Sequence, residues 1–132
     1  VDLKVERRNG DFVRTLITAG RVTAVHDASD GGLAVTLAEM AMSSGVGATL
    51  VAPQSLSRAG FWLGEDQARY VLTAKSAEAD RILAEAAAAG IPALKLGTTG
   101  GDAVKIDGED PFPVARLKQL NEEWLPKLMA AA

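Results

Sequence analysis

The central stretch of the sequence reads His26-Asp27-Ala28-Ser29-Asp30-Gly31-Gly32-Leu33-Ala34. It brings an imidazole, carboxylates, a hydroxyl and adjacent glycines together immediately before an apolar segment. Residues 21–25 are typical of a short buried strand, and residues 33–44 are typical of a helix. The polar residues are therefore predicted to lie at a strand-to-helix turn, where the free amides of a helix N-terminus attract anions.

Outward from this turn, the apolar pattern predicts alternating helices and strands. A first helix is expected to follow Asn9-Gly10 and to end at Gly20, and a later helix to run from an N-cap at Ser76 to Gly90. Further strands are expected over 48–51, 69–74, 93–97 and 103–106, with a hairpin turn over 98–102. A last helix follows Pro113, and Pro126 should end or kink it near Leu125.

These elements predict an α+β fold, an α/β sandwich in which helices pack on a mixed sheet of about four or five strands. At 132 residues the chain is expected to form a single domain over 1–132. Such a length buries roughly two thirds of the surface of the unfolded chain. The fold class by itself names no activity.

Composition excludes several classes of function. The net charge is -3 and the 14 Lys and Arg residues are scattered, which argues against a nucleic-acid partner. The absence of cysteine rules out disulfides and thiolate chemistry, and a single histidine rules out imidazole-rich metal sites. With no long apolar run and no signal peptide, no membrane association is expected and a cytoplasmic setting is the default.

A resemblance to a known family rests on three segments around the turn. They read Thr23-Ala-Val-His-Asp-Ala-Ser-Asp-Gly-Gly-Leu-Ala-Val35, Leu37-Ala-Glu-Met-Ala41 and Gly45-Val-Gly-Ala48. Residues 6–13, 64–70 and 91–97 add to it, while Ala28 and Ala68 depart from the residues usual at their positions. The chain resembles the phosphoribosylformylglycinamidine synthase II family, specifically its C-terminal domain of the aminoimidazole ribonucleotide synthetase-like type.

The resemblance implies that this chain is one domain of a longer ATP-dependent carbon-nitrogen ligase of purine biosynthesis. That enzyme converts formylglycinamide ribonucleotide and glutamine-derived ammonia to the amidine, using ATP and Mg²⁺. The implied partners are the N-terminal modules of its own chain, a glutaminase subunit, a small accessory subunit and the ribonucleotide. Because those modules carry most of the ATP and magnesium ligands and the catalytic histidine, the isolated domain is expected to be inactive and to hold no bound cofactor.

The candidate binding residues all belong to the central turn. With the resemblance, we expect phosphate or substrate contacts from His26, Asp27, Ser29, Asp30, Gly31 and Gly32. No catalytic residue is assigned, and a structural role is the more common one for a histidine at the end of a strand. No metal site is expected in the isolated domain, although Asp27 or Asp30 could hold magnesium in the full enzyme.

Each of these assignments has a simpler alternative. Ser29 or Asp30 could be a plain N-cap, with Gly31-Gly32 permitting tight helix packing. One of Asp27 and Asp30 is expected to cap the helix, because a carboxylate beside a phosphate is repulsive without an intervening cation.

One further alternative concerns the whole chain, and one further expectation concerns a helix. It could be a stand-alone small-molecule-binding or protein-interaction module that keeps the fold without activity. Residues 33–42 are apolar on nearly all sides, so we also expect that helix to present a face to the missing modules or to a second copy.

Overall fold

The computed structural model describes residues 2–54 and 57–130. The helices are α1 (Leu3–Thr18), α2 (Gly32–Ser44), α3 (Arg58–Leu63), α4 (Ser76–Ala88) and α5 (Val114–Ala130). The strands are β1 (Ala24–Asp27), β2 (Ala48–Leu50), β3 (Tyr70–Thr73), β4 (Gly97–Thr99), β5 (Ala103–Ile106) and β6 (Phe112–Pro113). None of the described helices is long and apolar enough to cross a membrane.

The strands form two separate sheets. β2 is parallel to β5 and antiparallel to β4, and β6 completes a mixed four-stranded sheet in the order β4-β2-β5-β6. β1 and β3 pair antiparallel as a two-stranded ribbon, with His26 opposite Val71. The predicted α+β fold with a mixed sheet and packed helices is confirmed, whereas the separate ribbon was not expected from the sequence.

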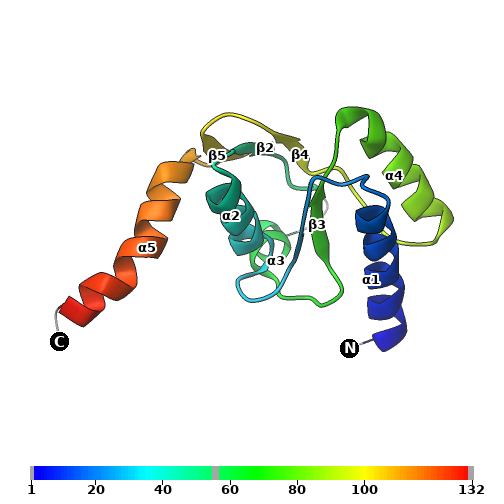
Figure 1. Cartoon of the computed structure of the whole chain (residues 1–132), viewed down its shortest axis with the longest axis horizontal. Helices are drawn as coiled ribbons and strands as arrows, with labels where there is room; N and C mark the ends of the chain where they lie inside the picture. The colour runs from blue at the N-terminus through cyan, green and yellow to red at the C-terminus, as the bar shows by residue number, and fades with distance from the viewer. Residues whose placement is uncertain (1, 55–56, 131–132) are drawn as a thin grey trace.

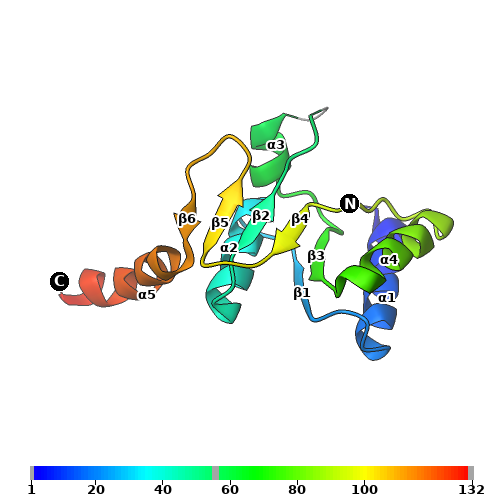
Figure 2. The same cartoon turned by 90° about the horizontal axis from the view of Figure 1, so that it is seen from above.

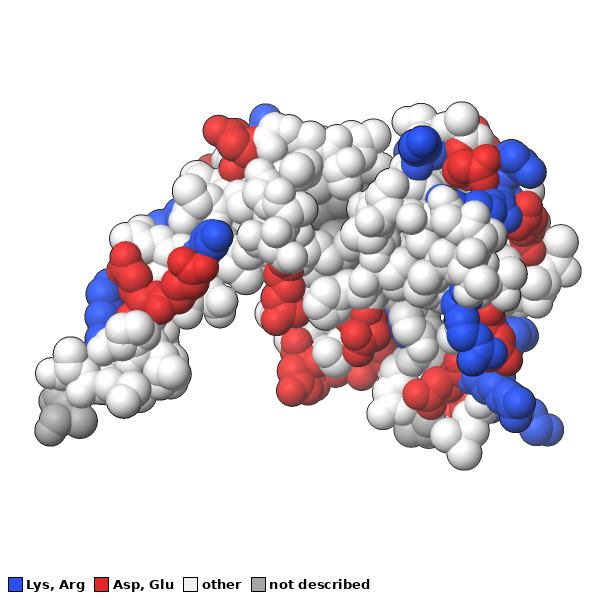
Figure 3. All heavy atoms as spheres, viewed as in Figure 1, with Lys and Arg blue, Asp and Glu red and all other residues white. Residues whose placement is uncertain are grey.

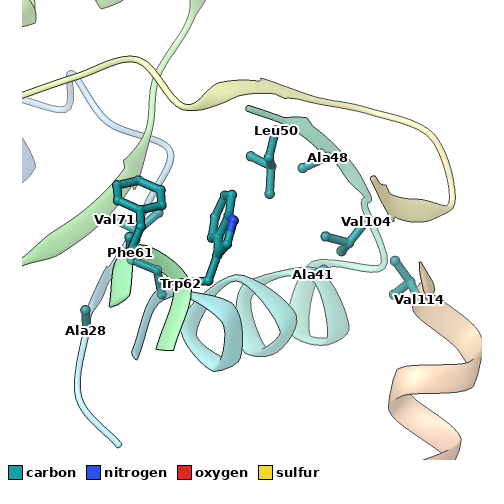
Figure 4. Close-up of a cluster of buried hydrophobic side chains, with 10 residues drawn as sticks. Ala28, Ala41, Ala48, Leu50, Phe61, Trp62, Val71, Val104 and Val114 are labelled. Atoms are coloured by element: carbon teal, nitrogen blue, oxygen red, sulfur yellow. The ribbon is translucent and has the colours of Figure 1, made fainter. Parts of the chain in front are cut away.

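The main apolar cluster lies between α2 and the four-stranded sheet (Figure 4). Leu50 and Val104 reach it from the strands, and Trp62 of α3 stands between Leu50 and α2. The rings of Phe61 and Trp62 meet edge to face with their centroids 4.9 Å apart. Val71 of β3 also belongs to this cluster, which fixes the ribbon against α2.

A second group of buried residues joins α1 to α4, which lie side by side in both views (Figures 1 and 2). Leu16 of α1 and Ile82 and Ala86 of α4 are almost completely buried. Arg21, in the segment after α1, fastens the two elements. Its guanidinium donates to Glu78 at 2.8 Å and to Glu85 at 2.6 Å, both on α4.

The first helix and the first strand begin at positions other than those predicted. α1 starts at Leu3 because the Asp2 side chain accepts hydrogen bonds from the amides of Lys4 and Val5, and the helix then passes through Gly10. β1 covers 24–27 rather than 21–25, since its pairing with β3 begins at Ala24 opposite Thr73. His26 and Asp27 consequently lie in the strand, which is half-exposed rather than buried.

The prediction of a hairpin over 98–102 is wrong, because β2 lies between β4 and β5. The amide of Gly100 donates to the carbonyl of Gly47, and the Gly47 amide donates to the Gly101 carbonyl, so this loop closes over the start of β2. β4 covers 97–99 rather than 93–97. A Cβ at Gly97 would lie 1.8 Å from the Thr49 carbonyl oxygen, so this close approach requires glycine.

Several further differences concern helix ends and short elements. The short helix α3, capped by Ser57, and the short strand β6 were not predicted. The N-cap of α4 is Lys75 rather than Ser76. Helix α5 continues through Pro126 to Ala130, although proline removes one backbone donor from the helix.

Helix α2 is covered by its own domain over most of its surface. Leu33 and Ala41 are buried, and Leu37 and Met40 pack against the main cluster. α2 contacts α3, α5, β1 and β3. The broad apolar face expected on this helix is therefore absent, because Val35, 41% exposed, is the one large apolar residue of α2 that is open to solvent. The other exposed large apolar side chains of the described residues are spread over several elements, with the largest group on α5.

Candidate functional site

The predicted turn connects β1 directly to α2. Its backbone closes through a 3.0 Å hydrogen bond from the Gly32 amide to the Ser29 carbonyl. Gly31 and Gly32 both have positive φ, +79° and +64°, a conformation that favours glycine at each position. The paired glycines thus bring the chain from the ribbon into the helix within a few residues.

Gly32 also permits a close backbone contact. A Cβ at this position would lie 2.6 Å from the carbonyl oxygen of Gly64 and 2.8 Å from the carbonyl carbon of Leu63. Both atoms belong to the backbone at the end of α3, which cannot easily move away. The alternative in which the glycines permit tight packing is therefore supported for Gly32.

The side chain bonded to this end of α2 belongs to Glu65. Its Oε1 accepts a 2.8 Å hydrogen bond from the amide of Gly31, the N-cap residue. Within the described residues, Ser29 and Asp30 are on the turn and cap nothing, and Asp27 lies in β1. The expectation of a cap from Ser29, Asp30 or Asp27 is wrong, because a carboxylate from the loop after α3 takes that position.

The loop that carries Glu65 is braced by Arg69. The Arg69 guanidinium donates to the carbonyl oxygens of Gly64 and Asp66, the latter at 3.1 Å. The Arg69 carbonyl in turn accepts a 2.9 Å bond from the amide of Ala28 in the turn. The segment 64–69 therefore forms a wall of the site beside the turn 28–32. Glu65 is a site residue that was not among the candidates predicted from the sequence.

His26 points toward α2 rather than away from the domain. Its Nδ1 lies 2.7 Å from the Asp27 carbonyl oxygen, and its Nε2 lies 3.3 Å from Oε2 of Glu39. Both ring nitrogens face oxygen acceptors, so a singly protonated ring can satisfy only one contact. The Asp27 carbonyl also accepts a bond from the hydroxyl of Thr36, which is buried. Through its contact with Glu39, His26 links β1 to α2.

Acidic side chains dominate the surroundings of the turn. Asp27 precedes the turn, Asp30 lies within it, Glu65 is bonded to it, and Glu39 lies beside His26. Across the described ranges, 2–54 and 57–130, no group of three or more His, Cys, Asp or Glu side chains could hold a metal ion. The cation of this wall, Arg69, is bonded to the carbonyl oxygens of Gly64 and Asp66, so an anion at the helix N-terminus would need further positive charge to offset the carboxylates.

Two open hollows adjoin the site. One, of about 370 Å³, lies between α1 and the ribbon and is lined in part by Val13, His26, Asp27 and Tyr70. Gly10 leaves room for the Tyr70 hydroxyl on its wall. The other, of about 390 Å³, lies between the start of α1 and the loop 65–68. Residues 28–32 line neither hollow, but Asp27 lines the first and Glu65 the second, and both of these side chains and that of Asp30 are exposed.

The family profile described as AIR synthase related protein, C-terminal domain, matches residues 1–107. Among curated proteins, the phosphoribosylformylglycinamidine synthase subunit PurL of Bradyrhizobium diazoefficiens is 54% identical over 130 residues. The alignment covers 98% of this chain and 18% of the relative. The chain therefore spans less than a fifth of the length of that relative.

Solved structures agree on the fold. Thermotoga maritima PurL complexed with FGAR superposes with a TM-score of 0.73 at 17% identity, covering 86% of this chain and 21% of that one. The PurLQS structure from the same organism gives a TM-score of 0.75, also at 17% identity, with the same coverage of both chains. At this identity the likeness concerns the fold.

Proposed function

The chain belongs to the family of AIR synthase related protein C-terminal domains, and from this premise we propose that it serves as the C-terminal module of a phosphoribosylformylglycinamidine synthase. The relative at 54% identity aligns with nearly the whole chain, which favours this function over a stand-alone binding module of the same fold. The activity proposed for the complete enzyme is the ATP-dependent conversion of formylglycinamide ribonucleotide and ammonia to the amidine.

The proposed role of this module is to bind a phosphoryl group of the ribonucleotide or nucleotide at the turn 28–32. The observation that carries it is the glycine turn at the N-terminus of the 13-residue helix α2. Amides at such a terminus and the helix dipole, about half a positive charge, both favour an anion. The bond from the Gly31 amide to the Glu65 carboxylate is an internal example of that preference.

The acidic surroundings support a site that another module completes. Asp27, Asp30 and Glu65 would repel a phosphoryl group unless a cation or basic side chains came between them. We propose that this counter-charge comes from the remainder of the longer polypeptide. The proposed reaction then requires both this module and the rest of the polypeptide, because the reacting groups must be held together in one geometry.

ATP and Mg²⁺ belong to the proposed complete enzyme. The described residues do not by themselves fit a resident magnesium ion, since no group of three suitable ligands exists among them. Asp27 and Asp30 could contribute ligands alongside phosphate oxygens, which are common magnesium ligands.

The proposed partners are the N-terminal modules of the same polypeptide, a glutaminase subunit and a small accessory subunit. The similarity of this chain to part of the Thermotoga maritima PurLQS structure supports an assembly of this kind. We also propose a cytoplasmic location, which follows from the proposed role in purine biosynthesis.

A segment exchange tests the proposed function. In the full-length Bradyrhizobium diazoefficiens relative, the 130 aligned residues would be replaced by this chain. We expect the chimera to retain ATP-dependent amidine formation within about tenfold of the parent. The isolated chain, given ATP, ribonucleotide and ammonium, should show no turnover.

The matched control is a chimera that carries Asp102→Asn, a change in the loop between β4 and β5, away from the turn. It should match the unmodified chimera. Turnover by the isolated chain, or a folded chimera without activity, would contradict the proposal.

A further inference from the structure

The carboxylate of Glu65 lies where the proposed phosphoryl group would bind. Its Oε1 accepts a 2.8 Å hydrogen bond from the amide of Gly31, the N-cap residue of α2. Gly31 has no side chain with which to cap the helix, so without Glu65 this amide would be open to a ligand. A backbone N–H is a single donor, so a carboxylate and a phosphoryl oxygen compete for it.

The backbone that carries Glu65 is held on both sides. The Arg69 guanidinium donates to the carbonyl oxygens of Gly64 and Asp66. The Arg69 carbonyl accepts a 2.9 Å bond from the amide of Ala28, which ties this loop to the turn. A rotation of the Glu65 side chain is therefore the movement that frees the Gly31 amide, and the loop backbone can stay in place.

The Glu65 side chain has room to rotate. It is exposed and, within residues 2–54 and 57–130, has no hydrogen-bond or ion-pair partner besides the Gly31 amide. It also lines the hollow of about 390 Å³ between the start of α1 and the loop 65–68. An exposed carboxylate can exchange a bond to the protein for bonds to water, so it can leave the amide without disturbing the packing of the domain.

The surrounding charges favour the bonded position while no ligand is present. Asp2, Glu6 and Asp66 line the same hollow, so a Glu65 side chain that rotates into it approaches other carboxylates. Figure 3 shows acidic side chains gathered at the lower centre of the molecule, below α2 and α3. The dipole of α2 attracts a negative group to its N-terminus. Repulsion from the hollow and attraction to the helix therefore act in the same direction.

We infer that Glu65 is an internal competitor of the phosphoryl group: its carboxylate closes the N-terminus of α2 in the free enzyme and rotates away when a ligand takes the Gly31 amide. The inference rests on the proposed function, because it concerns the regulation of the same turn. Only the open state binds the ligand, so the apparent affinity is reduced by the fraction of molecules in which the carboxylate is away from the amide.

Isothermal titration calorimetry on the chimeric synthase tests this inference, with formylglycinamide ribonucleotide and a non-hydrolysable ATP analogue titrated separately. Glu65→Asp keeps the charge but is too short to reach the amide from the held backbone, and Glu65→Ala removes the carboxylate. Both should lower the dissociation constant of the ligand whose phosphoryl group lies at the turn by at least about threefold, as for a site closed about two thirds of the time. The other ligand should be unaffected.

Glu6→Gln is the matched control, because it removes a carboxylate from the opposite side of the same hollow. It should change neither dissociation constant. Thermal melts check that each variant is folded. If loss of the cap unfolds a Glu65 variant, Glu65→Gln keeps an acceptor for the Gly31 amide and should still tighten binding, since a neutral acceptor competes less well.

Three results would overturn the inference. Tighter binding by Glu65→Ala but not by Glu65→Asp would show charge repulsion rather than competition for the amide. Weaker binding by both would show that Glu65 helps to hold the ligand. Unchanged binding of both ligands in an active chimera would reject the competitor and leave the proposed activity standing, whereas a chimera without turnover contradicts the proposed function itself.

Discussion

At the scale of single residues, the two glycines of the turn have different reasons to be glycine. A Cβ at Gly31 would lie 2.3 Å from Cγ2 and 2.9 Å from Cβ of Val35, a residue of α2 itself. A Cβ at Gly32 would instead meet the backbone carbonyl groups at the end of α3. The same dipeptide therefore shapes the helix N-terminus and lets the wall that carries Glu65 approach it.

Gly32→Ala should destabilise the domain much more than Gly20→Ala. Both positions have nearly equal positive φ, +64° and +66°, but nothing lies within 4 Å of a Cβ at Gly20. We expect a loss of about 1 kcal/mol for Gly20→Ala from backbone strain, and about 3 kcal/mol for Gly32→Ala, where a backbone clash is added. Urea unfolding measures both, and equal losses would show that the contact with residues 62–64 is unimportant.

The residues of the turn could be identified from the sequence, but their partners could not. Their types and their position before an apolar helix indicate an anion-binding turn on local grounds. The bond between Gly31 and Glu65 joins residues 34 positions apart, and no local pattern specifies it. Residues 64–70 carry part of the family resemblance, but only the packing of α3 against Gly32 brings them to the site.

At the scale of elements, those with strong local signals are predicted best. Helix α2 and strand β5 agree closely with the predicted ranges, because apolar periodicity and the flanking glycines define them. The position of β4 and the loop after it were missed, because they depend on where β2 pairs in the sheet. The start of α1 was missed because the Asp2 cap outweighs the cost of Gly10 within the helix.

The hydrogen bonds from Arg21 to Glu78 and Glu85 of α4, which we call the Arg21 clamp, should make the stability of the domain depend on pH. Hydrogen bonds from Arg21 lower the pKa of Glu78 and of Glu85 below the ordinary value of 4.5. A lowered carboxyl pKa stabilises the fold above the ordinary value, and this stabilisation is lost as pH falls through the folded pKa. Arg21→Gln should therefore lower Tm at neutral pH, and its difference from the unmodified chain should vanish in acid.

Arg81→Gln is the matched control for this clamp. Arg81 also pairs with Glu78, at 3.0 Å, but its side chain is well exposed and it makes no bond to the segment after α1. Thermal melts between neutral and acidic pH should show a smaller effect for this variant. A difference that stays constant with pH, or a larger effect of Arg81→Gln, would argue against the clamp.

At the scale of the whole molecule, the turn lies where the two parts of the fold meet. β1 belongs to the ribbon that packs with α1 and α4, and α2 lies under the four-stranded sheet (Figure 2). The loop from α3 closes the turn from a third direction. The fold thus places a helix N-terminus at its surface among carboxylates, with Arg69 as a nearby cation that is bonded to backbone carbonyl oxygens.

The most direct test is a structure of the chimeric synthase with formylglycinamide ribonucleotide and a nucleotide bound. The proposed function predicts a phosphoryl oxygen within hydrogen-bonding distance of a backbone amide between Ser29 and Leu33, with a cation or a basic side chain of another module beside Asp27 or Asp30. Ordered ligands whose phosphoryl groups all lie away from this turn, with Glu65 still bonded to Gly31, would contradict it.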